Sequence, residues 1–78
     1  MVHMPRFYFN FIDGQDRIED PEGMELPDAA AARQQAIVAV HDAQKTSFAL
    51  ARNWVGWSVE VVDDGGNMVL LLPFLKIE

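Results

Sequence analysis

The chain has 78 residues, half of them hydrophobic, with 12 acidic and 6 basic side chains and no cysteine. This length allows one domain, near the lower end of sizes that fold alone, and the lack of cysteine excludes a disulfide framework and a cysteine-based zinc site. The net charge of −6 argues against nucleic-acid or anionic-membrane partners, which need clustered Lys and Arg. No apolar run is longer than that of residues 68–72, which is far shorter than the ~20 residues of a membrane span.

The chain is organised as one unit, without internal repeats or low-complexity segments. We expect residues 1–3 to be a cloning remnant or a disordered start. Residues 4–78 are expected to form a single α+β domain.

A strand is predicted at residues 6–12, because apolar side chains alternate there with a period of two. One face carries Phe7, Phe9 and Phe11, and the other carries Tyr8, Asn10 and Ile12. The Asp-Gly pair at residues 13–14 is a hairpin turn signal. It predicts a short return strand at residues 17–20, which Pro21 and Gly23 end.

A long helix is predicted from Ala29 to about Ala51, a stretch rich in alanine and free of Gly and Pro. Asp28 is the expected N-cap, because its carboxylate can accept the free amides of the first turn. Small residues dominate the inner stripe: Ala29, Ala32, Ala36, Val40, Ala43, Ser47 and Leu50. Such a stripe lets a helix lie close to a sheet with bulky side chains.

Two further strands are predicted at residues 57–62 and 68–72, joined by an Asp- and Gly-rich turn at residues 63–67. The order of elements is then ββαββ. We expect an α+β fold, a four-stranded antiparallel sheet with one long helix packed on one face.

The net charge is concentrated in residues 13–28, which we call the acidic segment. It contains seven acidic residues and one basic residue, whereas the rest of the chain is neutral. Such a segment is either a solubilising edge or a docking surface for a basic protein or a cation. The candidate docking residues are Asp16, Glu19, Asp20, Glu22 and Glu25.

The predicted sheet has more apolar residues than one helix can cover. A sheet face in water is expected to be polar, but both faces of the last strand are apolar. We expect the second face to be buried by self-association into a dimer or higher oligomer, with packing under loops or tolerated exposure as the alternative. The predicted residues of this face are Tyr8, Ile12, Met68, Leu70 and Leu72.

No residue pattern predicts an active site. The two histidines, His3 and His41, do not have metal-ligand spacing, and neither Ser47 nor Ser58 lies in a Gly-x-Ser-x-Gly motif. The acidic segment lacks the spacing of an EF-hand loop. We therefore expect no catalytic, cofactor-binding or metal-binding residues, and no cofactor.

Several short motifs spread over residues 4–74 together resemble one known family. They are Met4-Pro5-Arg6-Phe7-Tyr8-Phe9, Asp13-Gly14, Asp20-Pro21-Glu22-Gly23-Met24-Glu25-Leu26 with Asp28, Ala32-Arg33, Ala36, Gly56-Trp57, Glu60-Val61, Asp63 and Pro73-Phe74. They are similar to a family of short bacterial proteins described as a domain of unknown function. That family has no assigned activity, cofactor or catalytic residue, so the resemblance implies a cytoplasmic bacterial protein and no particular chemistry.

The succession of an aromatic strand, an acidic hairpin and an Ala-rich helix also resembles HicB-type antitoxin domains. This second resemblance implies that an acidic face would mask a basic toxin or RNA-binding protein. The chain departs from that family after the helix, where a full hairpin follows in place of a DNA-binding extension, so no repressor function is implied.

Taken together, these patterns predict a non-enzymatic protein-interaction or regulatory module that self-associates through its sheet. The alternative is a small-ligand or divalent-metal-binding protein, with a site near the acidic hairpin or between subunits.

Overall fold

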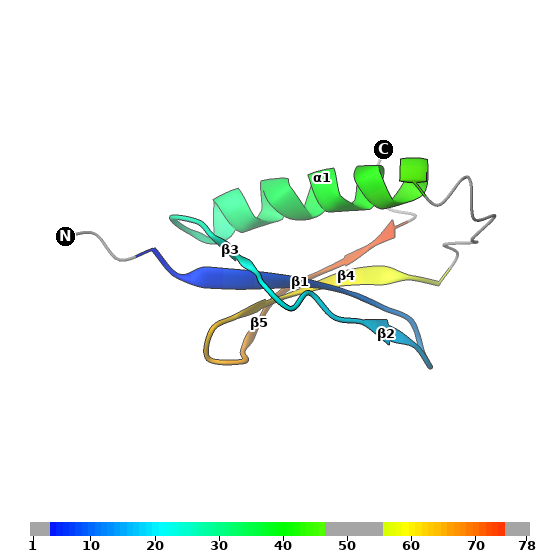
Figure 1. Ribbon diagram of the computed structural model, residues 1–78, viewed down its shortest axis with the longest axis horizontal. Helices are drawn as coiled ribbons and strands as arrows, with labels where there is room; N and C mark the ends of the chain where they lie inside the picture. The colour runs from blue at the N-terminus through cyan, green and yellow to red at the C-terminus, as the bar shows by residue number, and fades with distance from the viewer. Residues whose placement is uncertain (1–3, 47–55, 75–78) are drawn as a thin grey trace.

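The computed structural model describes residues 4–46 and 56–74, in which one helix covers one face of an antiparallel sheet (Figure 1). The elements are β1 (Arg6–Ile12), β2 (Arg17–Ile18), β3 (Met24–Glu25), α1 (Ala29–Thr46), β4 (Ser58–Asp63) and β5 (Met68–Pro73). The predicted α+β fold is confirmed. Residues 1–3 and the part of the predicted helix beyond Thr46 lie outside the described residues.

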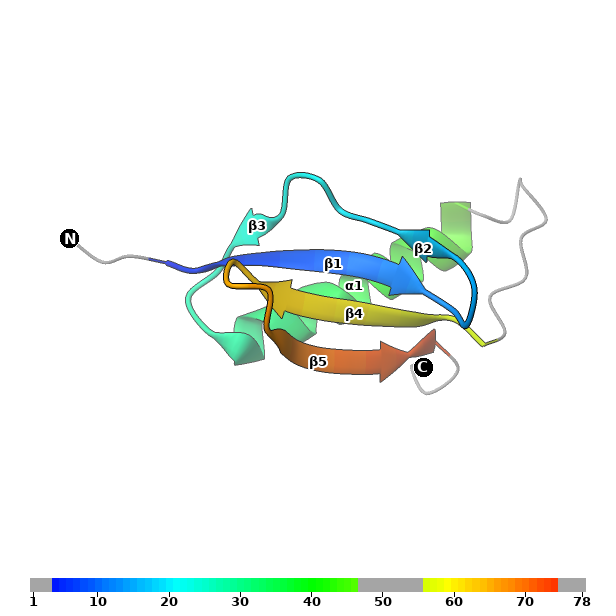
Figure 2. The ribbon, with the colours of Figure 1, turned by 90° about the horizontal axis from the view of Figure 1, so that it is seen from below.

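The strands lie in the order β2-β1-β4-β5, and β3 pairs with β1 at the same edge as β2. All of these pairings are antiparallel. The central pair joins β1 to β4, with Phe7 opposite Asp63 at one end and Ile12 opposite Ser58 at the other. Figure 2 shows the sheet from the side away from α1, with β5 at one edge and the short strands β2 and β3 at the other. We call this side the outer face.

The return strand of the first hairpin is shorter than predicted. The sequence pattern predicts a strand over residues 17–20, but β2 contains only Arg17 and Ile18. The chain then leaves β1 and returns to it as β3 at Met24. Two separate two-residue strands therefore share one edge of β1.

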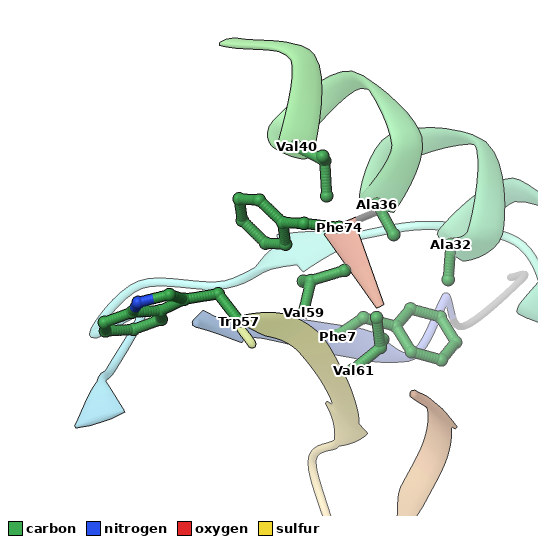
Figure 3. Packing of buried hydrophobic residues seen from close by; sticks show 8 residues of the cluster. All are labelled: Phe7, Ala32, Ala36, Val40, Trp57, Val59, Val61 and Phe74. Atoms are coloured by element: carbon green, nitrogen blue, oxygen red, sulfur yellow. The ribbon is translucent and has the colours of Figure 1, made fainter. Parts of the chain in front are cut away.

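The hydrophobic core lies between α1 and the sheet (Figure 3). Its buried members are Phe7, Ala32, Ala36, Val40, Trp57, Val59, Val61 and Phe74. The helix supplies Ala32, Ala36 and Val40, whereas the aromatic rings come from β1 and from residues next to β4 and β5. Small side chains on the inner side of a helix allow it to lie close to bulky rings. Phe11 and Phe74 add an edge-to-face pair, with ring centroids 5.5 Å apart.

The faces of β5 differ from the prediction. The alternating pattern predicts Leu70 and Leu72 on the outer face together with Met68, and this assignment is wrong, because both leucines pack against the core. The cause is a register shift: Val61 pairs with Leu70, whereas the next residue, Val62, pairs with Met68. One residue of β5 is skipped, and such a bulge exchanges the faces on its two sides.

In the described part of the chain, no helix is both long enough and apolar enough to cross a membrane. The helix α1 instead contributes its small residues to the core and exposes Val38 to solvent.

Gly23 is a position where the backbone geometry requires glycine. Its φ is +71°, and an added Cβ would lie 2.8 Å from the carbonyl oxygen of Phe7 and 2.9 Å from side-chain atoms of Arg6 and Tyr8. Gly66 also has a positive φ, +84°, but has open space around it. Gly14 has open space and no positive φ.

Replacing these three glycines by alanine should separate the cost of backbone strain from the cost of steric overlap. Gly23→Ala should lower the free energy of unfolding by about 3 kcal/mol, because it combines backbone strain with overlap. Gly66→Ala should lower it by about 1 kcal/mol, from strain alone, and Gly14→Ala should change it by less than about 0.5 kcal/mol. Urea unfolding measures all three, and equal losses for Gly23→Ala and Gly66→Ala would contradict the close approach.

Candidate functional site

The acidic segment is attached along the edge of β1, and one of its own carboxylates completes the attachment. Ile18 pairs with Phe11 and Met24 pairs with Phe7, which leaves the edge at Phe9 without a strand opposite it. There the Phe9 N–H donates to Oδ2 of Asp20 at 3.2 Å. The carboxylate thus takes the place of the missing strand partner.

The other polar atoms of Asp20 are also engaged in the fold. Its Oδ1 accepts the N–H groups of Glu22 at 3.2 Å and Gly23 at 3.1 Å. Its own N–H donates to Oδ1 of Asn10 at 3.0 Å. Asp20 therefore organises the connection between β2 and β3, as Asp commonly does by bonding backbone N–H groups a few residues ahead.

A polar network on the outer face ties the acidic segment to β4. Asn10 is only 4% exposed, and its Nδ2 donates to Oε1 of Glu60 at 3.2 Å. The same Oε1 accepts from Nη2 of Arg17 at 2.7 Å, while Nε of Arg17 donates to Glu19 at 2.8 Å. The hydrogen bonds to Glu19 and Glu60 raise the pKa of Arg17 further above its ordinary value, so this guanidinium keeps its charge.

A second basic residue, Arg6, holds the far end of the acidic segment. Its Nη1 donates to the carbonyl oxygen of Glu22 at 2.7 Å, and its Nη2 pairs with Oε2 of Glu25 at 3.3 Å. More than half of the Glu25 side chain remains exposed, and such surface ion pairs contribute about 0–1 kcal/mol. The Glu25 carboxylate therefore stays accessible.

The five predicted docking acids thus divide into three kinds. Asp20 is engaged in the fold by its hydrogen bonds. Glu19 and Glu25 are exposed members of ion pairs. The carboxylates of Asp16 and Glu22 are exposed and contact no hydrogen-bonding or ionic partner among the described residues. The role of Asp20 was not predicted, although an Asp-Pro-Glu-Gly run directly after a strand is a turn signal.

The most exposed large apolar side chain of the described residues, Met68, lies on β5. Met68 is 60% exposed, Leu71 46% and Val69 36%, and we call these three residues the β5 patch. Leu71 lies on the outer face, opposite Glu60 of β4. The predicted face residues Tyr8 and Ile12 also lie on the outer face and are half-buried. The outer-face candidates therefore lie on two separate strands, and the exposed ones, Met68 and Leu71, are both on β5.

A metal centre finds no support in the geometry of the described residues. Within residues 4–46 and 56–74, no group of three or more His, Asp or Glu side chains is placed to hold a metal ion.

One family matches the chain in comparisons with known proteins. Its model, described as "Domain of unknown function (DUF6894)", matches residues 6–75, which confirms the predicted resemblance. No curated protein and no solved structure matches the chain, and the resemblance to HicB-type antitoxin domains stays a prediction.

The hydrogen bonds of Asp20 give a testable stability difference within the acidic segment. Asp20→Asn should lower the free energy of unfolding by about 2 kcal/mol, because an amide nitrogen replaces one of the two acceptor oxygens. Asp16→Asn removes the same charge nearby and should change it by less than about 0.5 kcal/mol. Urea unfolding at neutral pH compares the two variants. Equal losses would mean that the negative charge matters and the acceptor geometry does not.

Two turn aspartates give a pH prediction. The N–H groups of Asp16 and Gln15 hold the pKa of Asp13 below its ordinary value of 3.8, and the N–H groups of Asn67 and Gly65 do the same for Asp63. A carboxyl with a lowered pKa stabilises the fold at neutral pH, and this stabilisation is lost as the pH falls below 3.8 through the folded-state pKa.

NMR titration of the two side-chain carboxyl carbons should therefore give midpoints below 3.8. The double variant Asp13→Ala, Asp63→Ala should lose less stability than the parent chain between about pH 5 and pH 3. Midpoints at or above the ordinary value would contradict the prediction.

Proposed function

The chain belongs to the family described as a domain of unknown function (DUF6894), and we propose that it is a non-enzymatic protein-interaction or regulatory module that self-associates through its sheet. The observation that supports this proposal is the β5 patch, where Met68, Val69 and Leu71 are each more than one-third exposed on a single strand. Contiguous apolar exposure on a small domain is typical of interaction surfaces.

The arrangement of layers explains why the β5 patch is exposed in the part of the chain that the structure describes. The sheet has two faces, and α1 packs on only one of them. A strand that is apolar on both faces is typical of a sheet covered on both sides. β5 has this composition, so we propose that its exposed apolar side chains contact another protein molecule.

The charges near the sheet do not oppose a second copy of the chain as that molecule. On the outer face, Arg17 pairs with Glu60, and Arg6 pairs with Glu25. Opposite charges are therefore paired within each copy, so two copies do not present a surface of one sign to each other. The β5 patch itself has no charged side chain.

Two other candidates have less support. A basic protein partner would bind the acidic segment, and the exposed carboxylates of Asp16 and Glu22 support it, but Asp20 is engaged in the fold and cannot contribute freely. A small ligand or divalent metal near the acidic hairpin or between subunits has no supporting observation in the described residues. A bacterial origin and a cytoplasmic location belong to the same proposal and rest on the family resemblance.

Self-association can be tested by light scattering at several concentrations. The parent chain should show a mass above that of the monomer, rising with concentration. Leu71→Lys should shift it to the monomer, because a charge in the apolar contact must be desolvated. Val38→Lys adds the same charge on the exposed side of α1 and should leave the mass unchanged. A monomer mass for the parent chain at all concentrations would overturn the proposal.

A further inference from the structure

Building on the proposed self-association, we infer that the contact is edge to edge. In this arrangement, β5 of one copy pairs antiparallel with β5 of a second copy, and Leu71 lies at the two-fold axis. The sheets of the two copies then continue into one. The inference rests on three observations: the direction in which the backbone groups of β5 point, the covering of one sheet edge but not the other, and the distance of the acidic segment from β5.

The register shows which backbone groups of β5 face outward. Phe74 donates its N–H to the carbonyl oxygen of Trp57 at 3.0 Å. In an antiparallel pair, residues alternate between bonding the neighbouring strand and facing away from it. Leu72 and Leu70 therefore bond β4, opposite Val59 and Val61. The N–H and C=O groups of Leu71 face away from β4, toward the open edge.

The position of Pro73 fits this register. Ser58 lies opposite Pro73, one step from the hydrogen-bonded pair of Trp57 and Phe74, so Pro73 also faces away from β4. Proline has no N–H, and at this place its absence costs the β4–β5 ladder no bond. It does remove one donor from the open edge. Because Pro73 cannot donate to another strand, the outward-facing N–H and C=O groups of Leu71 are the ones that can form the centre of such a pairing.

The two edges of the sheet differ in how well their backbone groups are covered. The edge of β1 is covered by β2, by β3 and by the Asp20 carboxylate. At the other edge, β5 is the last strand of the order (Figure 2), and its sequence from Met68 to Pro73 has no charged or polar side chain. Proteins usually protect edge strands with charges, bulges or covering segments. In β5 the bulge and Pro73 shorten the edge, but no strand of the described residues pairs with the apolar centre at Leu71.

Edge pairing keeps the acidic segments of two copies apart. The strand order places the acidic segment at the edge opposite β5. Seven strand spacings separate the two β2 strands in the joined sheet, about 34 Å at ~4.8 Å each. This exceeds the Debye length of about 8 Å at physiological salt. The negative charge concentrated in each acidic segment therefore hardly opposes this contact.

Stacking of the two outer faces is less favourable. It would cover Arg17 and Glu60, whose side chains are 46% and 17% exposed in the monomer. Desolvation of such an ion pair can exceed the attraction within it. Edge pairing leaves this network in solvent and still joins the β5 patches of the two copies.

A single introduced cysteine can test the register, because the chain has none of its own. Opposing residues of a hydrogen-bonded antiparallel pair have Cα atoms about 5.5 Å apart, within the range of a disulfide. Under mild oxidation, Leu71→Cys should form a disulfide-linked dimer at least about tenfold faster than Tyr8→Cys, which places the thiol on the outer face of β1.

Amide hydrogen exchange of the unmodified chain gives a second measurement that needs no substitution. The Leu71 N–H should exchange at least about tenfold more slowly in concentrated than in dilute solution. The amides of Leu70 and Leu72, which bond β4 in each copy, should change much less.

The outcomes separate this inference from the proposed function. Fast cross-linking at position 71 together with concentration-dependent protection of the Leu71 amide would support edge pairing. An oligomer without either signal would overturn edge pairing and leave self-association intact, whereas a monomer at all concentrations would overturn both. Protection of the Leu71 amide that appears only when cell extract is added would assign the edge to a strand of another protein and overturn the second copy.

Discussion

The backbone edge of β1 is the constraint on which the rest of the structure depends. Its N–H groups must be hydrogen-bonded, and a continuous second strand is not available to bond them. Two short strands bond the ends of this edge, and the Asp20 carboxylate bonds its centre through Phe9. The connection from β2 to β3 must then pass close to β1, which is why Gly23 has no room for a side chain.

Asp20 is one of several carboxylates whose negative charge serves the fold. Asp13, Asp28 and Asp63 also accept backbone N–H groups, in a turn, at the start of α1 and in a second turn. A carboxylate at such a place contributes to folding through local hydrogen bonds. Much of the acidic segment is therefore turn and cap chemistry, and only the carboxylates on its outside, such as Asp16 and Glu22, remain available for a partner.

The sequence predicted those features that depend on residues close together in the chain. The alternation in β1 predicted which face Phe7 and Phe11 occupy. Asp28 was predicted to be the N-cap, and its carboxylate does accept the Ala31 N–H. The faces of Leu70 and Leu72 were not predictable in this way, because the bulge depends on how β5 pairs with β4. The role of Asp20 was missed for a similar reason, since its acceptor bond reaches 11 residues back to Phe9.

The covered edge of β1 also determines how far strand pairing between copies can extend. A sheet with two open edges can add strands without limit, as fibrils do. Here Asp20, β2 and β3 occupy one edge, so among the described strands β5 alone would be open to pair with another copy. In the proposed dimer, a contact along β5 would occupy this edge in both copies and would close the assembly at two chains. The carboxylate that completes the fold would in this way also keep a protein with an apolar strand at its other edge from polymerising.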